Sequence, residues 1–286
     1  MNCAFLMSSC DSYEDTWDPF FQLLGKYWPD IPFRVYLNTE TKQYHPSKPL
    51  PFEVISCNTG TGLPWGTRMK RVLNSLPEDY VFHVLDDFFI QSPVRGSYLL
   101  ELLKLMEADP SIASFQLKAS RIEQGGEDSF VSKDTQSSSL DTAAGAPLRL
   151  VPLAGPDWKT CFNPTLWRKS VFIKWLRPFE SIWGFELYGS QRARIWKYPE
   201  KVFYVNEPLI YDYLWVKNCS VIINGKWLNE EPVDRFFAEH GIEIDYDARG
   251  RMSADEYRSL TMKDTLKRYT LRQIIQRCFF RVCSFF

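Results

Sequence analysis

DYVFHVLDDFFI, residues 79–90, is the stretch of sequence that decides the fold. It begins with a run of apolar residues that only His83 interrupts, which is typical of a strand buried on both faces. Two adjacent acids, Asp86 and Asp87, follow at once. Because a buried ionised carboxylate has to be paired or to bind a cation, these two acids need a partner.

The elements around this stretch alternate between strands and helices. Apolar runs and helical spacing predict strands at residues 3–9, 33–38 and 52–56 and helices at residues 17–28 and 67–76. We expect Asp15 or Thr16 to cap the first of these helices. This order predicts an α/β fold, a Rossmann-type, mostly parallel sheet flanked by helices, in which ligands bind at the carboxyl ends of the strands.

Composition excludes several classes of protein. The chain has 286 residues, a formal net charge of -1 and a pI near 6.3, which argues against a protein that coats nucleic acid. Its seven cysteines are odd in number and form no CxxC pair, so we expect reduced thiols. The sequence has neither a signal peptide nor an apolar run long enough to span a membrane, and a cytoplasmic location is the default expectation.

The acid pair has two interpretations. Carboxylate oxygens are the ligands that Mg²⁺ and Mn²⁺ prefer, so Asp86 and Asp87 are candidates for a divalent-metal site. Aspartate is also a common turn residue, and the pair could simply begin the next segment. The position at the end of a late strand, in an apolar context, favours the metal site.

The order of elements resembles the GT-A glycosyltransferases, which use nucleotide-diphosphate sugars. The resemblance rests on CDSYED, residues 10–15, and on VLDDF, residues 84–88, and it covers roughly residues 1–225. In that family a DXD-type motif at the second position binds Mn²⁺ or Mg²⁺, which holds the donor diphosphate. The resemblance implies that Asp87 binds the metal and that Asp86 contacts the donor ribose or a metal-bound water. Leu85 departs from the motif, because the family often has an acid there.

A second segment, SIWGFELYGS at residues 181–190, resembles the region that supplies the catalytic acid of inverting GT-A enzymes. The resemblance implies that Glu186 is a general base, which removes a proton from the acceptor hydroxyl. In the alternative interpretation, the neighbouring Trp183 and Phe185 belong to the core and Glu186 is an exposed acid at the start of a helix.

Further residues are candidates on weaker grounds. The resemblance implies that Asp11 contacts the donor, although aspartate at such a junction is also ordinary turn chemistry. Arg68 could reach the diphosphate from a helix start or be solvated. Trp158 and Trp183, together with Trp167, could form a platform for an acceptor sugar, or belong to the core. We expect His83 to be a core residue, and His240 is more often structural than a metal ligand.

The last 25 residues differ from the rest of the chain. Residues 262–286 are strongly basic and have a helical apolar stripe, which predicts an amphipathic helix separate from a catalytic domain at residues 1–261. We expect this helix to contact the inner face of the cell membrane, or else to dock on protein. The predicted membrane contacts are Arg268, Arg272, Arg277, Phe279 and Arg281.

Taken with the resemblance, these features predict a bacterial, metal-dependent, inverting glycosyltransferase that is peripheral to the membrane. Its donor would be a nucleotide-diphosphate sugar, with UDP as the expected nucleotide. Its acceptor would be a hydroxyl of a lipid-linked saccharide or a surface polysaccharide. Two alternatives stay open: a sugar nucleotidyltransferase, and a non-catalytic glycan-binding or scaffold protein.

Overall fold

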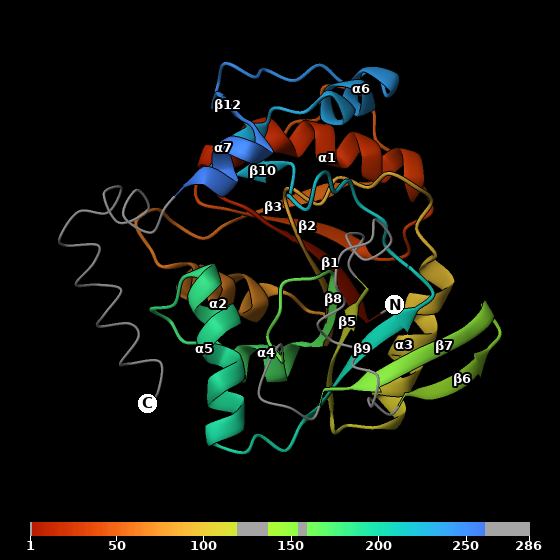
Figure 1. Ribbon diagram of the computed structural model, residues 1–286. Coiled ribbons are helices and arrows are strands. Elements are labelled where there is room, and N and C mark those ends of the chain that lie inside the picture. Colours follow the sequence, from red (N-terminus) through yellow and green to blue (C-terminus); the bar gives the residue numbers. More distant parts are fainter. Residues whose placement is uncertain (1, 119–136, 154–158, 261–286) are drawn as a thin grey trace.

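A computed structural model describes residues 2–118, 137–153 and 159–260. They form a nine-stranded sheet in the order β3-β2-β1-β4-β8-β5-β9-β7-β6, in which β7 and β8 run opposite to the other strands (Figure 1). The bounds are β1 Cys3–Ser8, β2 Arg34–Thr39, β3 Val54–Asn58, β4 Tyr80–Leu85, β5 Ile112–Leu117, β6 Ser138–Thr142, β7 Gly145–Pro152, β8 Thr165–Arg168 and β9 Lys201–Glu207. The predicted fold class, a mostly parallel sheet flanked by helices, is confirmed.

Helices cover both faces of the sheet and create two apolar cores. On β1, Phe5 and Met7 face one core while Ala4 and Leu6 face the other, as the period-two alternation of a strand requires. The first core contains side chains of α1 Glu14–Tyr27, α3 Gly96–Ala108 and α6 Glu231–Glu239; the second contains those of α2 Trp65–Ser75, α4 Lys169–Trp175 and α5 Ile182–Ile195. Because β1 is buried on both faces, its position is strongly specified by the cores.

The order of the strands reverses at β1, although β1 and β4 run parallel. Strand β1 continues through β2 to β3 on one side, whereas β4 pairs with the other side of β1. The register places Ser8 opposite Leu85, so the two strands end side by side. Such a reversal leaves a crevice at the carboxyl ends of the strands, and the acid pair follows Leu85 directly.

The predicted cap of the first helix is wrong. Helix α1 begins at Glu14, immediately after a 3₁₀ turn at Asp11–Tyr13, and no side chain caps it. The turn supplies a backbone partner for the start of the helix, since Glu14 N–H donates to the Asp11 carbonyl. Asp15 lies inside the first helical turn and pairs with Arg249 instead.

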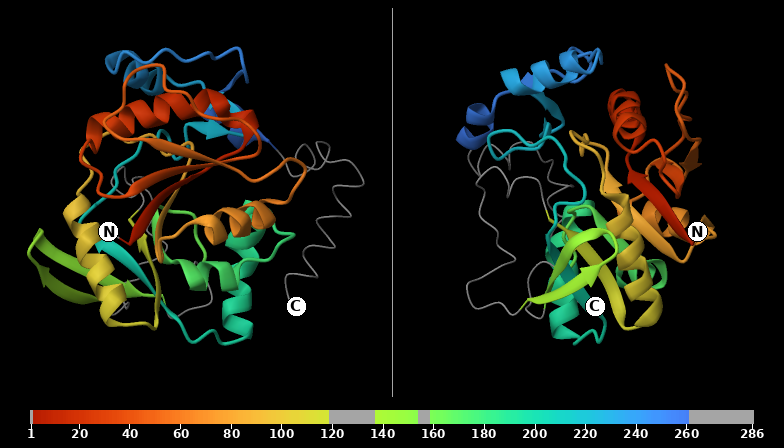
Figure 2. Two further views of the ribbon diagram at one scale, coloured as in Figure 1. Left: turned by 180° about the vertical axis from the view of Figure 1, so that it is seen from behind. Right: turned by 90° about the vertical axis from the view of Figure 1, so that its right-hand side faces the viewer.

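A small C-terminal unit packs on α1, next to the main sheet (Figures 1 and 2). It contains a three-stranded sheet with α6 and α7, and its strands and second helix are β10 Ile222–Ile223, β11 Lys226–Leu228, β12 Arg251–Met252 and α7 Ala254–Ser259. Asn224 and Gly225 join β10 to β11 with φ of 51° and 74°, the positive values of a two-residue hairpin turn. Trp227 is fully buried and stacks on Phe89 at 5.7 Å between ring centroids.

The predicted amphipathic helix at residues 262–286 lies outside the described residues, so the membrane contacts and the domain boundary after residue 261 stay predictions. Within the described ranges, no helix combines the length and the apolar character needed to cross a bilayer.

Candidate active site

A cleft of about 990 Å³ opens where β1 and β4 end. One wall comes from the chain after β1 and from the start of α2, a second from the start of α5, and a third from residues 215–225 of the C-terminal region. Asp86 and Asp87 line the cleft at the carboxyl end of β4, beside the end of β1. Its volume is that of a site for a ligand of nucleotide-sugar size.

The two acids are held by hydroxyl groups from opposite walls. Ser9 Oγ donates to Asp86 Oδ2 at 2.5 Å, and Trp17 Nε1 donates to the same Ser9 oxygen at 2.7 Å. Ser220 Oγ donates to Asp87 Oδ2. Neutral donors therefore orient the two carboxylates. Among the described residues, no basic side chain forms an ion pair with either of them.

Burial makes both carboxyl groups reluctant to ionise. Desolvation, reinforced by the neighbouring charge of Asp87, raises the pKa of Asp86 to about 8, although Ser9 and Arg249 oppose the rise. Desolvation raises the pKa of Asp87 to about 6, against the hydrogen bond from Ser220. Two adjacent acids in such a site are stabilised in their charged form by a cation.

The acid pair fits a divalent cation that also binds substrate phosphates. Asp87 Oδ1 is buried and has no hydrogen-bond partner, so one carboxylate oxygen remains for a metal. The described residues contain no group of three or more His, Cys, Asp or Glu side chains that could enclose a metal by themselves. Mg²⁺ commonly binds through one or two carboxylates and completes its shell with phosphate and water.

This electrostatic arrangement predicts how stability depends on pH. Because the folded pKa values of both acids lie above the unfolded value near 3.8, the folded protein holds more protons, and the metal-free protein should lose stability as the pH rises from about 4 to about 8. At pH 8 we expect Asp86→Asn to be more stable than the unmodified protein, by an amount on the order of 1 to 3 kcal/mol that shrinks toward pH 5. Urea unfolding in EDTA measures it.

Asp109→Asn is the control, because its pKa is displaced the other way. Hydrogen bonds from Ser111 and Lys201 lower the pKa of the exposed Asp109 to about 2. Removing this carboxylate should lower stability at neutral pH rather than raise it. If the stability of Asp86→Asn varied with pH as that of the unmodified protein does, burial would not be raising the pKa of Asp86.

Arg68 lies where the sequence predicted it, in the first turn of α2 and on the wall of the cleft. It is buried, and its Nη1 donates to the Ser9 carbonyl at 3.0 Å, beside the Asp86 anchor. Its Nε has no partner. Among the described residues that line the cleft it is the one basic side chain, so it can balance the charge of a bound anion.

The contacts of Asp11 in the structure differ from the contact with the donor that the sequence predicted. Its carboxylate accepts the backbone N–H groups of Glu40, Thr41 and Lys42 and the Thr41 hydroxyl, which ties the turn after β1 to the chain after β2. Desolvation raises its pKa, but these hydrogen bonds outweigh it and leave the pKa lowered. Asp11 is not among the residues that line the cleft, and its donor contact stays a prediction.

Glu186 does not line the cleft. Its Oε1 accepts the backbone N–H of Phe162 at 3.2 Å, just before β8, which pairs antiparallel with residues 80–83 of β4. The start of α5 lines the cleft through Ser181, Ile182 and Trp183, whereas Glu186, one turn later, does not. The general-base role therefore stays a prediction.

The aromatic candidates separate into surface and core. Trp183 lines the cleft and is 66% exposed, the largest value among the exposed large apolar residues of the described part. Trp167 is buried and stacks on Phe172 at 4.8 Å, so its place in an acceptor platform is excluded. Trp158 lies outside the described residues.

Two of the three histidines have structural surroundings. His83 is buried within β4, as predicted, and desolvation lowers its pKa to about 3. His240 ends α6, where its ring nitrogens bond the Tyr27 hydroxyl at 2.7 Å and the Phe236 carbonyl at 2.6 Å. Neither of them lines the cleft, so His240 is not a ligand of a metal held there.

Several cleft residues escaped the sequence analysis. Ser9 and Ser220, which orient the acids, carry no motif, and Ser220 is 133 positions away from Asp87. Tyr13 and Trp215 also line the cleft. Only the Asn-Gly pair at residues 224–225 had a usable signal, since it marks a hairpin whose tip forms part of the third wall.

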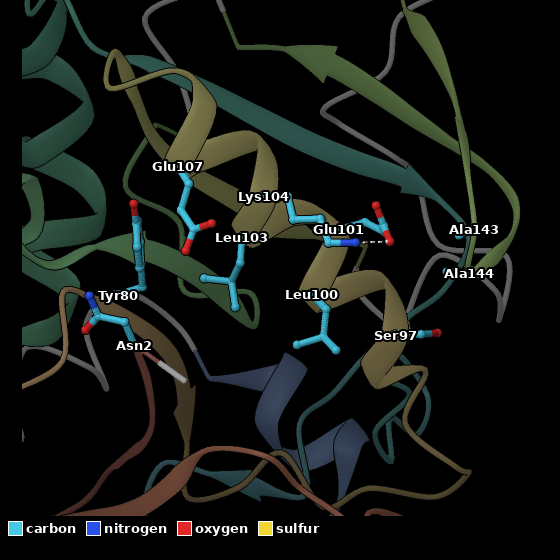
Figure 3. Close-up of a pocket in the computed structure, with 10 residues that line it drawn as sticks. All are labelled: Asn2, Tyr80, Ser97, Leu100, Glu101, Leu103, Lys104, Glu107, Ala143 and Ala144. Atoms are coloured by element: carbon cyan, nitrogen blue, oxygen red, sulfur yellow. Dashed lines mark hydrogen bonds and ion pairs between the residues drawn. The ribbon is translucent and has the colours of Figure 1, made fainter.

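A second cavity of about 450 Å³ lies beside α3 and the first residue of β4 (Figure 3). Its charged residues are Glu101, Lys104 and Glu107, of which Lys104 and Glu101 form an ion pair at 2.9 Å. It is at the amino end of β4, opposite to the acid pair, and lacks an unpaired charge cluster. The cleft at the carboxyl ends is thus the candidate site.

Comparison with known proteins finds similarity in structure only. No protein-family model matches the chain, and no curated protein is similar in sequence. Residues 1-349 of S. aureus TarS in complex with UDP-GlcNAc have a TM-score of 0.46 at 12% identity, over 98% of this chain and 79% of that one. The galactosyltransferase LgtC with donor and acceptor sugar analogs has a TM-score of 0.40 at 10% identity, over 83% of this chain and 95% of that one.

A CMP:2-keto-3-deoxy-manno-octonic acid synthetase complexed with CTP has a TM-score of 0.39 at 12% identity, over 71% of this chain and 89% of that one. By their names these three neighbours bind different ligands, namely UDP-GlcNAc, sugar analogs and CTP. At TM-scores below 0.5 they carry no weight for the function, which is inferred below from the residues of the cleft.

Proposed function

We propose that the protein is a metal-dependent glycosyltransferase, which moves a sugar from a nucleotide-diphosphate donor to a hydroxyl of a saccharide acceptor. The observation that carries the proposal is the acid pair: two adjacent carboxylates with raised pKa values, one with a buried free oxygen, at the end of β4 in a large cleft. If the pair served only to form a turn, its burial would cost free energy that the same turn at the hydrated surface would avoid. The pair is suited to a cation that carries a diphosphate.

Each residue of the cleft has a role in this proposal. Asp87 holds the cation through its free oxygen, and Ser220 keeps that carboxylate in place. Asp86, fixed by Ser9, faces the ribose or a water of the cation. When bound, the cation neutralises the charge that develops on the leaving diphosphate. Arg68 adds a fixed positive charge on the same wall.

Glu186 is the base in the inverting form of the proposal. A carboxylate that accepts a proton from the acceptor hydroxyl, on the face of the sugar opposite to the diphosphate, leads to inversion at the anomeric carbon. Its hydrogen bond from Phe162 N–H ties the side chain to the segment before β8. The exposed ring of Trp183, three residues earlier on α5, offers the acceptor sugar an apolar face.

The experiment that tests the function is thermal unfolding with UDP, in the presence and absence of Mn²⁺. A ligand at a hundred times its dissociation constant stabilises the fold by about 2.7 kcal/mol, which raises the midpoint by roughly 5 to 10 °C in a protein of this size. We expect a shift that requires both Mn²⁺ and UDP and disappears when EDTA is added. CDP, GDP and CTP are the matched ligands.

Each result points to one class of protein. A Mn²⁺-dependent shift with UDP supports the transferase and its expected nucleotide. A larger shift with CTP than with any diphosphate would favour a nucleotidyltransferase. No shift with any nucleotide would reject the donor site and leave the glycan-binding alternative.

A further inference from the structure

Arg249 joins the C-terminal unit to the wall of the cleft that follows β1. Its side chain is 8% exposed and forms a two-pronged ion pair with Asp15, in which Nε donates to Oδ2 at 2.7 Å and Nη2 bonds Oδ1. Trp227 Nε1 donates to the same carboxylate at 3.1 Å. A planar guanidinium that is held at two points has a fixed orientation, because both of its bonds constrain one plane.

That orientation sets the position of Tyr13. The guanidinium carbon of Arg249 lies 4.3 Å from the centroid of the Tyr13 ring, within the range of a cation–π contact. Tyr13 lines the cleft beside the acid pair, and its hydroxyl is raised in pKa to about 12 by desolvation and then by the charge of Asp86. One face of the ring is thus covered by Arg249, while the residue still lines the cleft.

Arg249 also holds the third wall of the cleft, at the hairpin tip that lies beside Tyr13. Its Nη1 donates to the Gly225 carbonyl at 3.2 Å, and Gly225 is part of the hairpin tip that lines the cleft. Its Nη2 donates to the Ser12 carbonyl at 2.9 Å, next to Tyr13. One side chain that does not itself line the cleft therefore connects two of the walls, which belong to segments more than 200 residues apart in the sequence.

We propose that Arg249 is a positioning residue for the nucleotide: with Asp15 it fixes Tyr13 and the hairpin tip, which lie side by side, as the part of the cleft wall against which the nucleoside part of the donor lies. We call Arg249, Asp15 and Tyr13 the clasp. The proposal rests on the proposed function and extends it, because it makes the C-terminal unit a part of the nucleotide site. A wall held rigid before binding spares the ligand the entropic cost of ordering it.

The chain contains a matched control two residues away. Arg251 lies 4.1 Å from the centroid of the Tyr246 ring and pairs with Asp234 at 2.6 Å, so it repeats the chemistry of the clasp. None of these three control residues lines the cleft. Loss of either arginine removes one stacked ring contact and one ion pair from the same unit, and only Arg249 touches the cleft walls.

Calorimetric titration with UDP in Mn²⁺ compares Arg249→Gln, Arg249→Lys and Arg251→Gln in the full chain. We expect Arg249→Gln to weaken UDP binding by about tenfold or more, and Arg251→Gln to stay within about twofold of the unmodified protein. Arg249→Lys keeps the charge but loses the planar guanidinium that bonds Asp15 at two points, so its UDP affinity should lie between those of the other two variants. Equal weakening by Arg249→Gln and Arg251→Gln, or none by Arg249→Gln, would overturn the proposal. If Arg249→Gln does not fold, Arg249→Lys decides in its place.

Hydrogen exchange without nucleotide separates the clasp from the proposed function. Arg249→Gln should speed amide exchange in residues 9–15 and 222–228 more than Arg251→Gln does. If the unmodified protein binds no UDP, the transferase proposal fails, while faster exchange in these two segments still supports the clasp as the contact that fixes the walls. The same exchange in both variants would reject the clasp whether or not UDP binds.

Discussion

Asp87→Asn is expected to abolish the Mn²⁺-dependent stabilisation by UDP and to lower turnover by about a hundredfold or more. The substitution keeps the shape of the side chain and an oxygen that can accept the hydrogen bond from Ser220. It removes the negative charge and replaces one carboxylate oxygen with an NH₂ group, which a cation does not bind. Thermal unfolding and release of UDP from a donor sugar measure the two effects.

Glu186→Gln is the matched comparison, because it also exchanges one carboxylate of a proposed site residue for an amide. The amide can still accept the Phe162 N–H, so the local structure should persist. We expect this variant to bind UDP and Mn²⁺ normally and to lose turnover, since it has no base. Asp87→Asn with undiminished binding would assign the acid pair to turn structure, and Glu186→Gln with full turnover would remove Glu186 from the mechanism.

Arg192→Ala is expected to produce the largest loss of stability. Arg192 and Glu180 are each 1% exposed and form an ion pair, and Arg192 also donates to the Trp175 carbonyl at 3.3 Å. Removing one member of a buried pair leaves a charge without compensation, which costs about 3–5 kcal/mol. In a protein of this size we expect the thermal midpoint to fall by roughly 10 °C.

The pH dependence of this loss identifies its cause. Desolvation already raises the pKa of Glu180, and Arg192 opposes the rise. Without Arg192 the folded pKa should rise further, so Glu180 binds a proton on folding and the deficit shrinks as the pH is lowered toward 5. Arg235→Ala, which breaks exposed pairs with Glu231 and Glu239, should change stability by less than about 1 kcal/mol. A deficit that does not vary with pH would mean lost packing.

Glu180, the acid of this ion pair, is a further cleft residue that the sequence analysis did not single out. Residues 177–180 cross the start of α2, where Gly66 N–H donates to the Glu180 carbonyl at 2.9 Å. A Cβ at Gly66 would lie 2.0 Å from the Arg177 carbonyl oxygen, so only glycine allows this approach. Glu180 lines the cleft, yet its charge is paired with Arg192, and no local motif marks it in the way that the segment at residues 181–190 marks Glu186.

The fold could be predicted because its signals are local. The apolar run before Asp86 marked β4, and the alternation of strands and helices placed the acid pair at the correct end of the sheet. Arg68 followed from its position at a helix start. These inferences need only periodicity and the rule that ligands bind at the carboxyl ends of strands.

The rest of the site depends on contacts that periodicity does not encode. Ser220 reaches Asp87 only because the C-terminal region packs over the sheet, and the partner of Asp15 is 234 positions away, so local sequence predicts a helix cap instead. The donor contact that the resemblance implies for Asp11 stays a prediction, and its hydrogen bonds to the chain after β2 follow from no local pattern. Side-chain pairs at such separations are set by tertiary packing.

The Asn224-Gly225 hairpin and Arg249 bear on the order in which the protein is made. During synthesis the nine-stranded sheet has all its strands by residue 207, and the acid pair can reach its position then. The third wall emerges later, and the arginine that locks it to Tyr13 later still. A nascent chain therefore completes the strands of its sheet some forty residues before the arginine that joins the cleft walls, so the ability to bind is acquired after the sheet is complete.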